Sequence, residues 1–140
     1  NYYKCNSYNE DSEENKMEKN KVDLAKKEIE RYNHFFIRYM NHHKSKALAE
    51  ELESKINTNI KDFIALKKLP QEELDFLKVA LDIVIKSRIK LKYTYVFGYY
   101  MVNCKENQRM LFEHQQYLLE RDADLLHEFL ENESIRNLQK

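Results

Sequence analysis

Apolar side chains recur along most of the chain at alternating steps of three and four residues, the spacing of one face of an α-helix. The first stripe predicts a helix over about residues 11–43, which Asp11 or Ser12 can cap. Its apolar members are Val22, Ala25, Ile29, Tyr32, Phe36 and Tyr39. A second stripe predicts a second helix and consists of Leu48, Leu52, Ile56, Ile60 and Phe63.

The chain then breaks near residues 67–70, and Pro70 suits the first turn of a third helix. That helix carries one apolar stripe, composed of Leu74, Leu77, Leu81, Val84, Ile85 and Ile89. It continues into an aromatic segment, residues 93–100, for which a buried helix at the bundle centre, a strand and a ligand-lined aromatic pocket are all open. We favour the buried helix, because no turn signal separates this segment from the helix before it. Gly98 then marks a close approach between helices.

Polar residues 103–107 predict a loop, and a fourth helix follows it. Its apolar positions are Leu111, Leu118, Leu119, Leu125, Leu126, Phe129 and Leu130. Residues 132–134 can interrupt this helix before a last short turn. Composition also favours helices, because one Gly and one Pro leave little material for the tight turns of all-β or Rossmann-type folds. We therefore predict an all-α chain, an extended and mostly antiparallel bundle of about four long helices.

Charge and hydropathy exclude several classes of protein. Basic and acidic residues balance at 24 each and are interspersed, which argues against a nucleic-acid binder. No stretch of about 18 apolar residues is present, so no membrane span is expected. The first residues lack the basic and apolar segments of a signal peptide. Two cysteines are too few for a disulfide framework, so we expect an intracellular protein, of the cytoplasm or the nucleus.

Catalytic chemistry has little support in the sequence. The histidines are scattered, and neither cysteine has a partner at the spacing of a zinc site. A di-metal site in a helical bundle needs Glu-x-x-His on two helices, and the nearest match is one segment, Asp124-Leu125-Leu126-His127. We therefore predict no catalytic residue and no cofactor in this chain. A di-metal enzyme is the weakest of the alternatives.

Four segments, taken in order along the chain, resemble the Ariadne domain of RING-between-RING ubiquitin ligases. They are residues 3–11 (YKCNSYNED), 38–42 (RYMNH), 76–82 (FLKVALD) running into 93–97 (YTYVF), and 112–120 (FEHQQYLLE). The resemblance implies that residues 1–9 are the end of an upstream catalytic module, called Rcat, with its linker. Residues 10–140 are then an Ariadne helical domain. The family's domain usually continues through at least one more long helix, which is expected to be missing here.

The resemblance implies a regulatory function rather than a catalytic one. In that family, a ubiquitin-conjugating enzyme bound to the RING passes ubiquitin to a cysteine of Rcat. The Ariadne domain folds back over Rcat and hides this cysteine, and binding to a neddylated cullin-RING ligase complex relieves the block. Zinc belongs to the parent protein's upstream RING-type modules. The partners implied for this chain are therefore Rcat, within the same protein, and the cullin complex.

The same resemblance implies contact positions for Rcat. Leu48 and Ala49 stand where family members carry a Phe-Glu pair, so Leu48 can keep an apolar contact whereas Ala49 cannot supply a carboxylate. Acidic contacts carry over onto Glu113 and Asp124, which are three helical turns apart and so share a face. The alternative is that both acids are ordinary solvated charges. Cys5 aligns with the last zinc ligand of Rcat and is expected to be unliganded in this chain, because one thiolate does not hold zinc.

A second class of function is a stand-alone helical scaffold that recognises a peptide or a partner helix and has no relation to ubiquitin transfer. The sequence upstream of Asn1 distinguishes the two, because a ligase requires cysteine-rich zinc modules there.

Overall fold

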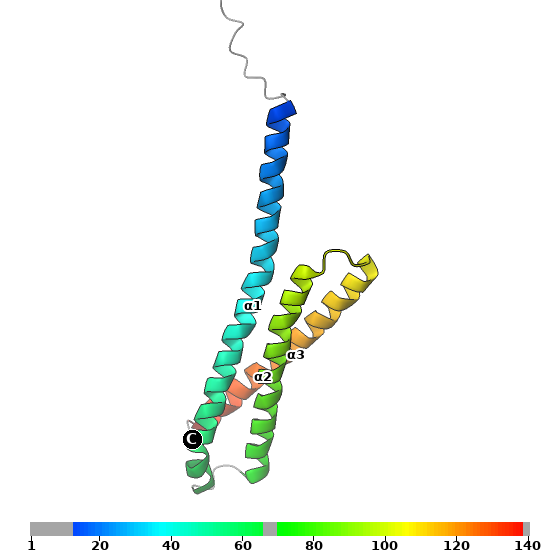
Figure 1. Ribbon diagram of the computed structural model, residues 1–140. Helices are drawn as coiled ribbons and strands as arrows, with labels where there is room; N and C mark the ends of the chain where they lie inside the picture. Colours follow the sequence, from blue (N-terminus) through cyan, green and yellow to red (C-terminus); the bar gives the residue numbers. More distant parts are fainter. Residues whose placement is uncertain (1–12, 66–69, 139–140) are drawn as a thin grey trace, which may run out of the picture. The chain divides into compact units, whose positions relative to one another are not determined.

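The computed structural model describes residues 13–65 and 70–138, and Figure 1 shows that these residues are almost entirely helical. The three helices are α1 (Glu13–Ala65), α2 (Gln71–Tyr100) and α3 (Glu106–Leu138). The described residues contain no strand, so the predicted all-α class is confirmed. None of the described helices carries a stretch that is long and apolar enough to cross a membrane.

The chain divides into two compact units, Asn1–His34 and Phe35–Lys140. The described part of the first unit is a single helical segment, the beginning of α1. A single helix cannot bury its own apolar stripe, and accordingly Val22 and Ile29 are exposed. The buried core cluster lies within the second unit.

Helix α1 is continuous where the sequence predicted two helices, so the described residues hold three helices instead of about four. Nothing between His43 and Leu48 breaks a helix, because this stretch has neither Gly nor Pro. The apolar stripe only appeared to be interrupted there. The buried face of α1 passes through His42, Ala49 and Ile56 at steps of seven residues, and its polar member hides the continuity.

Of the other predicted helix boundaries, those at Pro70 and at the loop before α3 are confirmed, and the one at residues 132–134 is not. Pro70 takes an extended conformation (φ −62°, ψ 150°) and its carbonyl accepts hydrogen bonds from the amides of Glu73 and Leu74, so α2 begins directly after it. The predicted loop is present between Tyr100 and Glu106. The interruption expected at residues 132–134 is absent, since α3 runs through them to Leu138.

Helix α2 supplies most of the core, and α1 and α3 pack against it. The buried cluster draws Ala49 and Ile56 from α1 and Leu130 from α3, and its members on α2 are Leu77, Ala80, Leu81 and Val84. As the residue number increases along α2, the residue numbers of the contacting positions on α1 decrease, and so do those on α3. Arg88 meets His42 and Asp124, whereas nearer the end of α2, Tyr99 meets Phe35 and Phe97 meets Phe112. In this unit α2 is therefore antiparallel to both α1 and α3.

The aromatic segment 93–100 is helical, as expected, but only part of it is buried. Tyr95 is buried, whereas Tyr93, Phe97 and Tyr100 are exposed. The expected burial of the whole segment was wrong because its aromatic side chains project all round the helix. Neighbouring helices cover only the side that carries Leu91 and Tyr95.

Gly98 does mark a close approach between helices. A Cβ atom placed on Gly98 would lie 2.9 Å from a ring carbon of Phe35 and 3.6 Å from one of Phe112. We expect Gly98→Ala to change the free energy of unfolding by less than about 1 kcal/mol, because the gain in helix propensity offsets a small shift of the Phe35 ring. Gly98→Val should destabilise by roughly 1–3 kcal/mol, because two further carbons overpack the contact. Urea unfolding followed by circular dichroism measures both, and equal effects of Ala and Val would contradict the close approach.

Candidate functional site

A group of hydrogen-bonded polar side chains lies inside the second unit, between the three helices. We call this group the polar cluster, and it comprises His42, Arg88, Tyr95, Glu120, Asp124 and His127. Arg88, on α2, is at its centre and is only 3% exposed. His42, from α1, and His127, from α3, are buried as well.

The Arg88 guanidinium joins the three helices directly. Its Nη1 lies 2.6 Å from Asp124 Oδ1 and 3.3 Å from His42 Nδ1, and its Nη2 lies 3.3 Å from His127 Nδ1. The Asp124 side chain is 60% exposed, so the ion pair joins a buried cation to a carboxylate at the surface. A charged group this deeply buried requires such partners, because burial without them costs several kcal/mol.

These contacts fix the tautomer of each histidine. A guanidinium can only donate hydrogen bonds, so the Nδ1 atoms of His42 and His127 must both accept. The ring proton of each neutral histidine is then on Nε2. For His42 this proton points to Glu120 Oε1, 3.1 Å away, and the Tyr95 hydroxyl donates to Glu120 Oε2 at 2.8 Å.

The surroundings shift three pKa values. Burial lowers the pKa of His42 below its ordinary value; the positive charge of Arg88 acts in the same direction and Glu120 opposes it. Burial, followed by the charge of Arg88, also lowers the pKa of His127. Burial raises the pKa of Tyr95, and its hydrogen bond to Glu120 adds to this effect. Both histidines are therefore held in the neutral form near neutral pH.

Two buried nitrogen atoms of the polar cluster have no hydrogen-bond partner among the described residues: Arg88 Nε and His127 Nε2. A carboxylate oxygen of Glu131 lies 3.6 Å from His127 Nε2, which is too long for a hydrogen bond. The polar cluster is thus incompletely satisfied at Arg88 Nε and His127 Nε2, whereas both ring nitrogens of His42 have a partner.

The polar cluster was not predicted from the sequence, although one signal for it is present there. Arg88 occupies a position on the apolar stripe of α2, between Val84 and Leu91, where a charged residue is unexpected. The Asp124-x-x-His127 segment, considered above as half of a di-metal motif, binds this guanidinium with both side chains. Among the described residues no group of three His, Cys, Asp or Glu side chains gathers as a metal site.

The positions expected to contact Rcat differ in exposure. Leu48 is 54% exposed, whereas its neighbour Ala49 is 0% exposed and belongs to the core cluster. Glu113 is exposed on α3 and has no ion pair among the described residues. Asp124 lies on the same helix and is held by Arg88. Cys5 lies outside the described residues.

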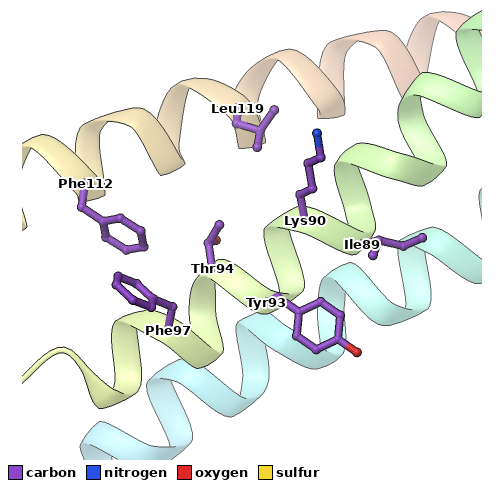
Figure 2. Close-up of a pocket in the computed structure, with 7 residues that line it drawn as sticks. All are labelled: Ile89, Lys90, Tyr93, Thr94, Phe97, Phe112 and Leu119. Atoms are coloured by element: carbon purple, nitrogen blue, oxygen red, sulfur yellow. The ribbon is translucent and has the colours of Figure 1, made fainter.

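A second feature is an open apolar groove of about 520 Å³ between α2 and α3. It is lined by Ile89, Lys90, Tyr93, Thr94, Phe97, Phe112 and Leu119. Figure 2 shows the rings of Phe97 and Phe112 facing each other across the groove, with centroids 5.3 Å apart. The Thr94 hydroxyl accepts from Gln116 and donates to the Leu91 carbonyl, so this polar group is already used. The groove coincides with the aromatic segment for which a ligand-lined pocket was one of the alternatives.

The described residues therefore combine exposed side chains on α1 and α3 with a buried polar cluster. Cys104 is half-buried and its Sγ lies 3.9 Å from the Met101 carbonyl oxygen. The exposed groups expected to bind a partner are an apolar side chain on α1 and two carboxylates on α3. Helical rise places those carboxylates about 16 Å apart along α3.

Comparison with known proteins identifies the family. The Ariadne domain family matches residues 30–138. The chain is 36% identical over 132 residues to the E3 ubiquitin-protein ligase ariadne-1 of Drosophila melanogaster, an alignment that covers 94% of this chain and 25% of that protein. It is 32% identical over 132 residues to the E3 ubiquitin-protein ligase ARIH1 of Homo sapiens, covering 94% and 23%. With the E3 ubiquitin-protein ligase dbl4 of Schizosaccharomyces pombe the identity is 34% over 131 residues, covering 94% and 25%.

The chain spans about a quarter of the length of the curated relatives it matches, for example 25% of ariadne-1. No solved structure matches it. The family match covers all of α2 and α3 and the part of α1 that packs against them. It contains three of the four sequence segments that carry the resemblance, and this chain belongs to the Ariadne domain family.

Proposed function

We propose that this chain is the regulatory Ariadne domain of a RING-between-RING E3 ubiquitin-protein ligase. In this proposal it covers the catalytic cysteine of the adjacent Rcat module and so restrains ubiquitin transfer. The observation that carries the proposal is similarity over 94% of the chain to proteins named E3 ubiquitin-protein ligases. Catalysis then belongs to the parent protein, whose upstream RING-type modules would bind zinc and a ubiquitin-conjugating enzyme.

The exposed positions on α1 and α3 support a contact with Rcat. Leu48 offers an apolar side chain, and Glu113 offers a carboxylate with no ion pair among the described residues. Asp124 uses Oδ1 to bind Arg88, which leaves Oδ2 for a cation of the partner in a fixed direction. Ala49 is buried, so we infer that it acts by letting the core pack closely and not by touching Rcat.

Deleting residues 10–140 from the full-length ligase tests the proposal. We expect discharge of ubiquitin from the conjugating enzyme to become faster, because the Rcat cysteine is no longer covered. A rate that does not rise would contradict autoinhibition. The measurement is single-turnover discharge under matched enzyme concentrations.

A point variant tests the acidic contact within the intact protein. We expect Glu113→Lys to lower the ratio of closed to open protein about fivefold or more, the effect of losing an exposed charge contact of about 1 kcal/mol. The matched control is Asp122→Lys, nine residues further along α3 and so on the opposite face of the helix. The measurement is again single-turnover discharge of ubiquitin by the full-length ligase. Equal increases in the discharge rate for both variants would mean that the change of charge, and not a specific contact of Glu113, causes the effect.

Docking to a neddylated cullin-RING ligase complex is the second part of the proposal. Such a complex can activate the ligase only by binding the open state better than the closed state. We therefore expect the neddylated complex to accelerate the full-length ligase and to leave the variant lacking residues 10–140 unchanged. Activation of both proteins alike would place the effect outside this domain.

A further inference from the structure

The polar cluster joins three helices through hydrogen bonds between side chains. The core cluster is apolar, whereas at Arg88 the helices α1, α2 and α3 are connected through one guanidinium and two imidazoles. Each imidazole accepts from Arg88 through Nδ1. An imidazole that takes up a second proton loses this acceptor and presents an N–H to the N–H groups of the guanidinium. The contacts that join the helices therefore require both rings to be neutral.

We propose that His42, Arg88 and His127 form an acid-sensitive clamp, which holds α1, α2 and α3 together while both histidines are neutral and loosens when either is protonated. The proposal rests on the geometry of the polar cluster and does not depend on the proposed function. The ligand of this site is a proton, which binds Nδ1 of either histidine and removes the acceptor for Arg88.

The groups around His42 act in both directions. On α2 it faces Arg88 and the Tyr95 ring, which stacks on it with centroids 5.5 Å apart. On α3 it faces Glu120, at 3.1 Å, and Asp124, and both carboxylates favour protonation. Burial and the charge of Arg88 outweigh them, so the pKa of His42 is lowered. On α1 itself, Arg38 adds a further positive charge near Tyr95.

His127 has fewer groups that favour a proton. Arg88 faces it from α2, and Asp124 and Glu131 lie on its own helix. Its Nε2 has no hydrogen-bond partner among the described residues, so a charged ring would remain poorly solvated there. Burial and Arg88 lower its pKa as well. The pKa values of both histidines are therefore shifted downward, so both favour the neutral form of the ring in the folded chain.

The sign of the pH dependence follows from these shifts. A histidine in the unfolded chain titrates near 6.5, and both histidines titrate lower in the folded chain. The unfolded state thus binds more protons in this range. The stabilisation is fully present above about pH 6.5 and is lost as the pH falls from there through the folded pKa values. The equilibrium constant for unfolding should rise by up to about tenfold per pH unit for each histidine.

The test measures urea unfolding of the 140-residue chain between pH 7.5 and 5.5, a range above the titration of ordinary carboxylates. The variants are His42→Asn and His127→Asn, singly and together, because the Asn oxygen can still accept from Arg88 but does not titrate. The matched control is His114→Asn, an exposed histidine on α3. We expect the double variant to lose most of the pH dependence and the control to retain all of it. A double variant with the pH dependence of the unmodified chain would overturn the proposal.

A second measurement tests the proposed clamp if the double variant fails to fold. Nitrogen-15 chemical shifts of the imidazole rings report the tautomer of each histidine in the unmodified chain. At pH 7.5 we expect both His42 and His127 to carry the proton on Nε2, with His42 and His127 becoming protonated only as the chain loosens. A proton on Nδ1 of either ring, or protonation without any change in stability, would refute the clamp.

Discussion

Leu81→Ala should lower the free energy of unfolding of the 140-residue chain by roughly 3 kcal/mol. Leu81 is 0% exposed and lies in the core cluster with Ala49, Ile56 and Leu130, so it contacts the region where all three helices meet. Truncation removes three carbons and leaves a cavity that long, regular helices can fill only in part. Urea unfolding followed at the helical circular dichroism band measures this loss.

The control for this prediction is Ile83→Ala, two residues further along the same helix. Ile83 is 49% exposed, so the same kind of truncation should cost no more than about 1 kcal/mol. The slope of the free energy with urea should be unchanged in both variants, since neither alters the surface exposed on unfolding. Equal losses for Leu81→Ala and Ile83→Ala would mean that α2 presents a different face to its neighbours.

Periodicity predicted α2 well because its stripe is both apolar and buried. Leu74, Leu77, Leu81 and Val84 were all assigned to this stripe, and all are buried. The loop before α3 was also predicted, since its polar residues separate two strongly apolar segments. In both places the local signal and the packing agree, and local signals are what a single sequence carries.

On α1 the predicted apolar stripe is only partly buried, because Ile56 belongs to the core cluster and Leu52 packs against it while Leu48 does not. Leu48 was placed on the stripe of Leu52 and Ile56, yet Leu48 is exposed and Ala49 is fully buried. A small residue lets two helices approach closely, so the contact is marked by Ala49 and not by the more hydrophobic neighbour. The same effect produced the apparent break in α1, because His42 continues the buried face without being apolar.

The position of Arg88 on an apolar stripe was visible in the sequence, but the partners of Arg88 could not be predicted because they depend on the register between helices. Arg88 lies 46 residues from His42 and 39 from His127 along the chain. Periodicity shows which face of a helix is buried but not the register, that is, the position of one helix along the axis of its neighbour. The register is set by packing of the core cluster around Leu81 and Leu130. Only the packed unit brings the two histidines to one guanidinium.

The ion pair between Arg88 and Asp124 should behave asymmetrically when each partner is removed. We expect Asp124→Ala to lower the free energy of unfolding by roughly 3 kcal/mol, because it leaves a buried guanidinium without its carboxylate. Arg88→Met should cost less, about 2 kcal/mol, because the Asp124 carboxylate is 60% exposed and returns to water, and the buried Nδ1 atoms of His42 and His127 that lose their donor carry no charge. Methionine is long and apolar enough to fill the space of the arginine stem.

The double variant, Arg88→Met with Asp124→Ala, gives the decisive comparison. It should be more stable than Asp124→Ala alone, because no buried charge remains to be solvated. The control is Asp82→Ala, which removes one partner of the exposed pair Lys86–Asp82 and should cost less than about 1 kcal/mol. Chemical unfolding at pH 7.5 is the measurement, a pH at which both histidines of the unmodified chain are neutral. If Asp124→Ala costs no more than Asp82→Ala, Arg88 does not depend on that carboxylate, and the polar cluster is not the electrostatic centre of the three helices.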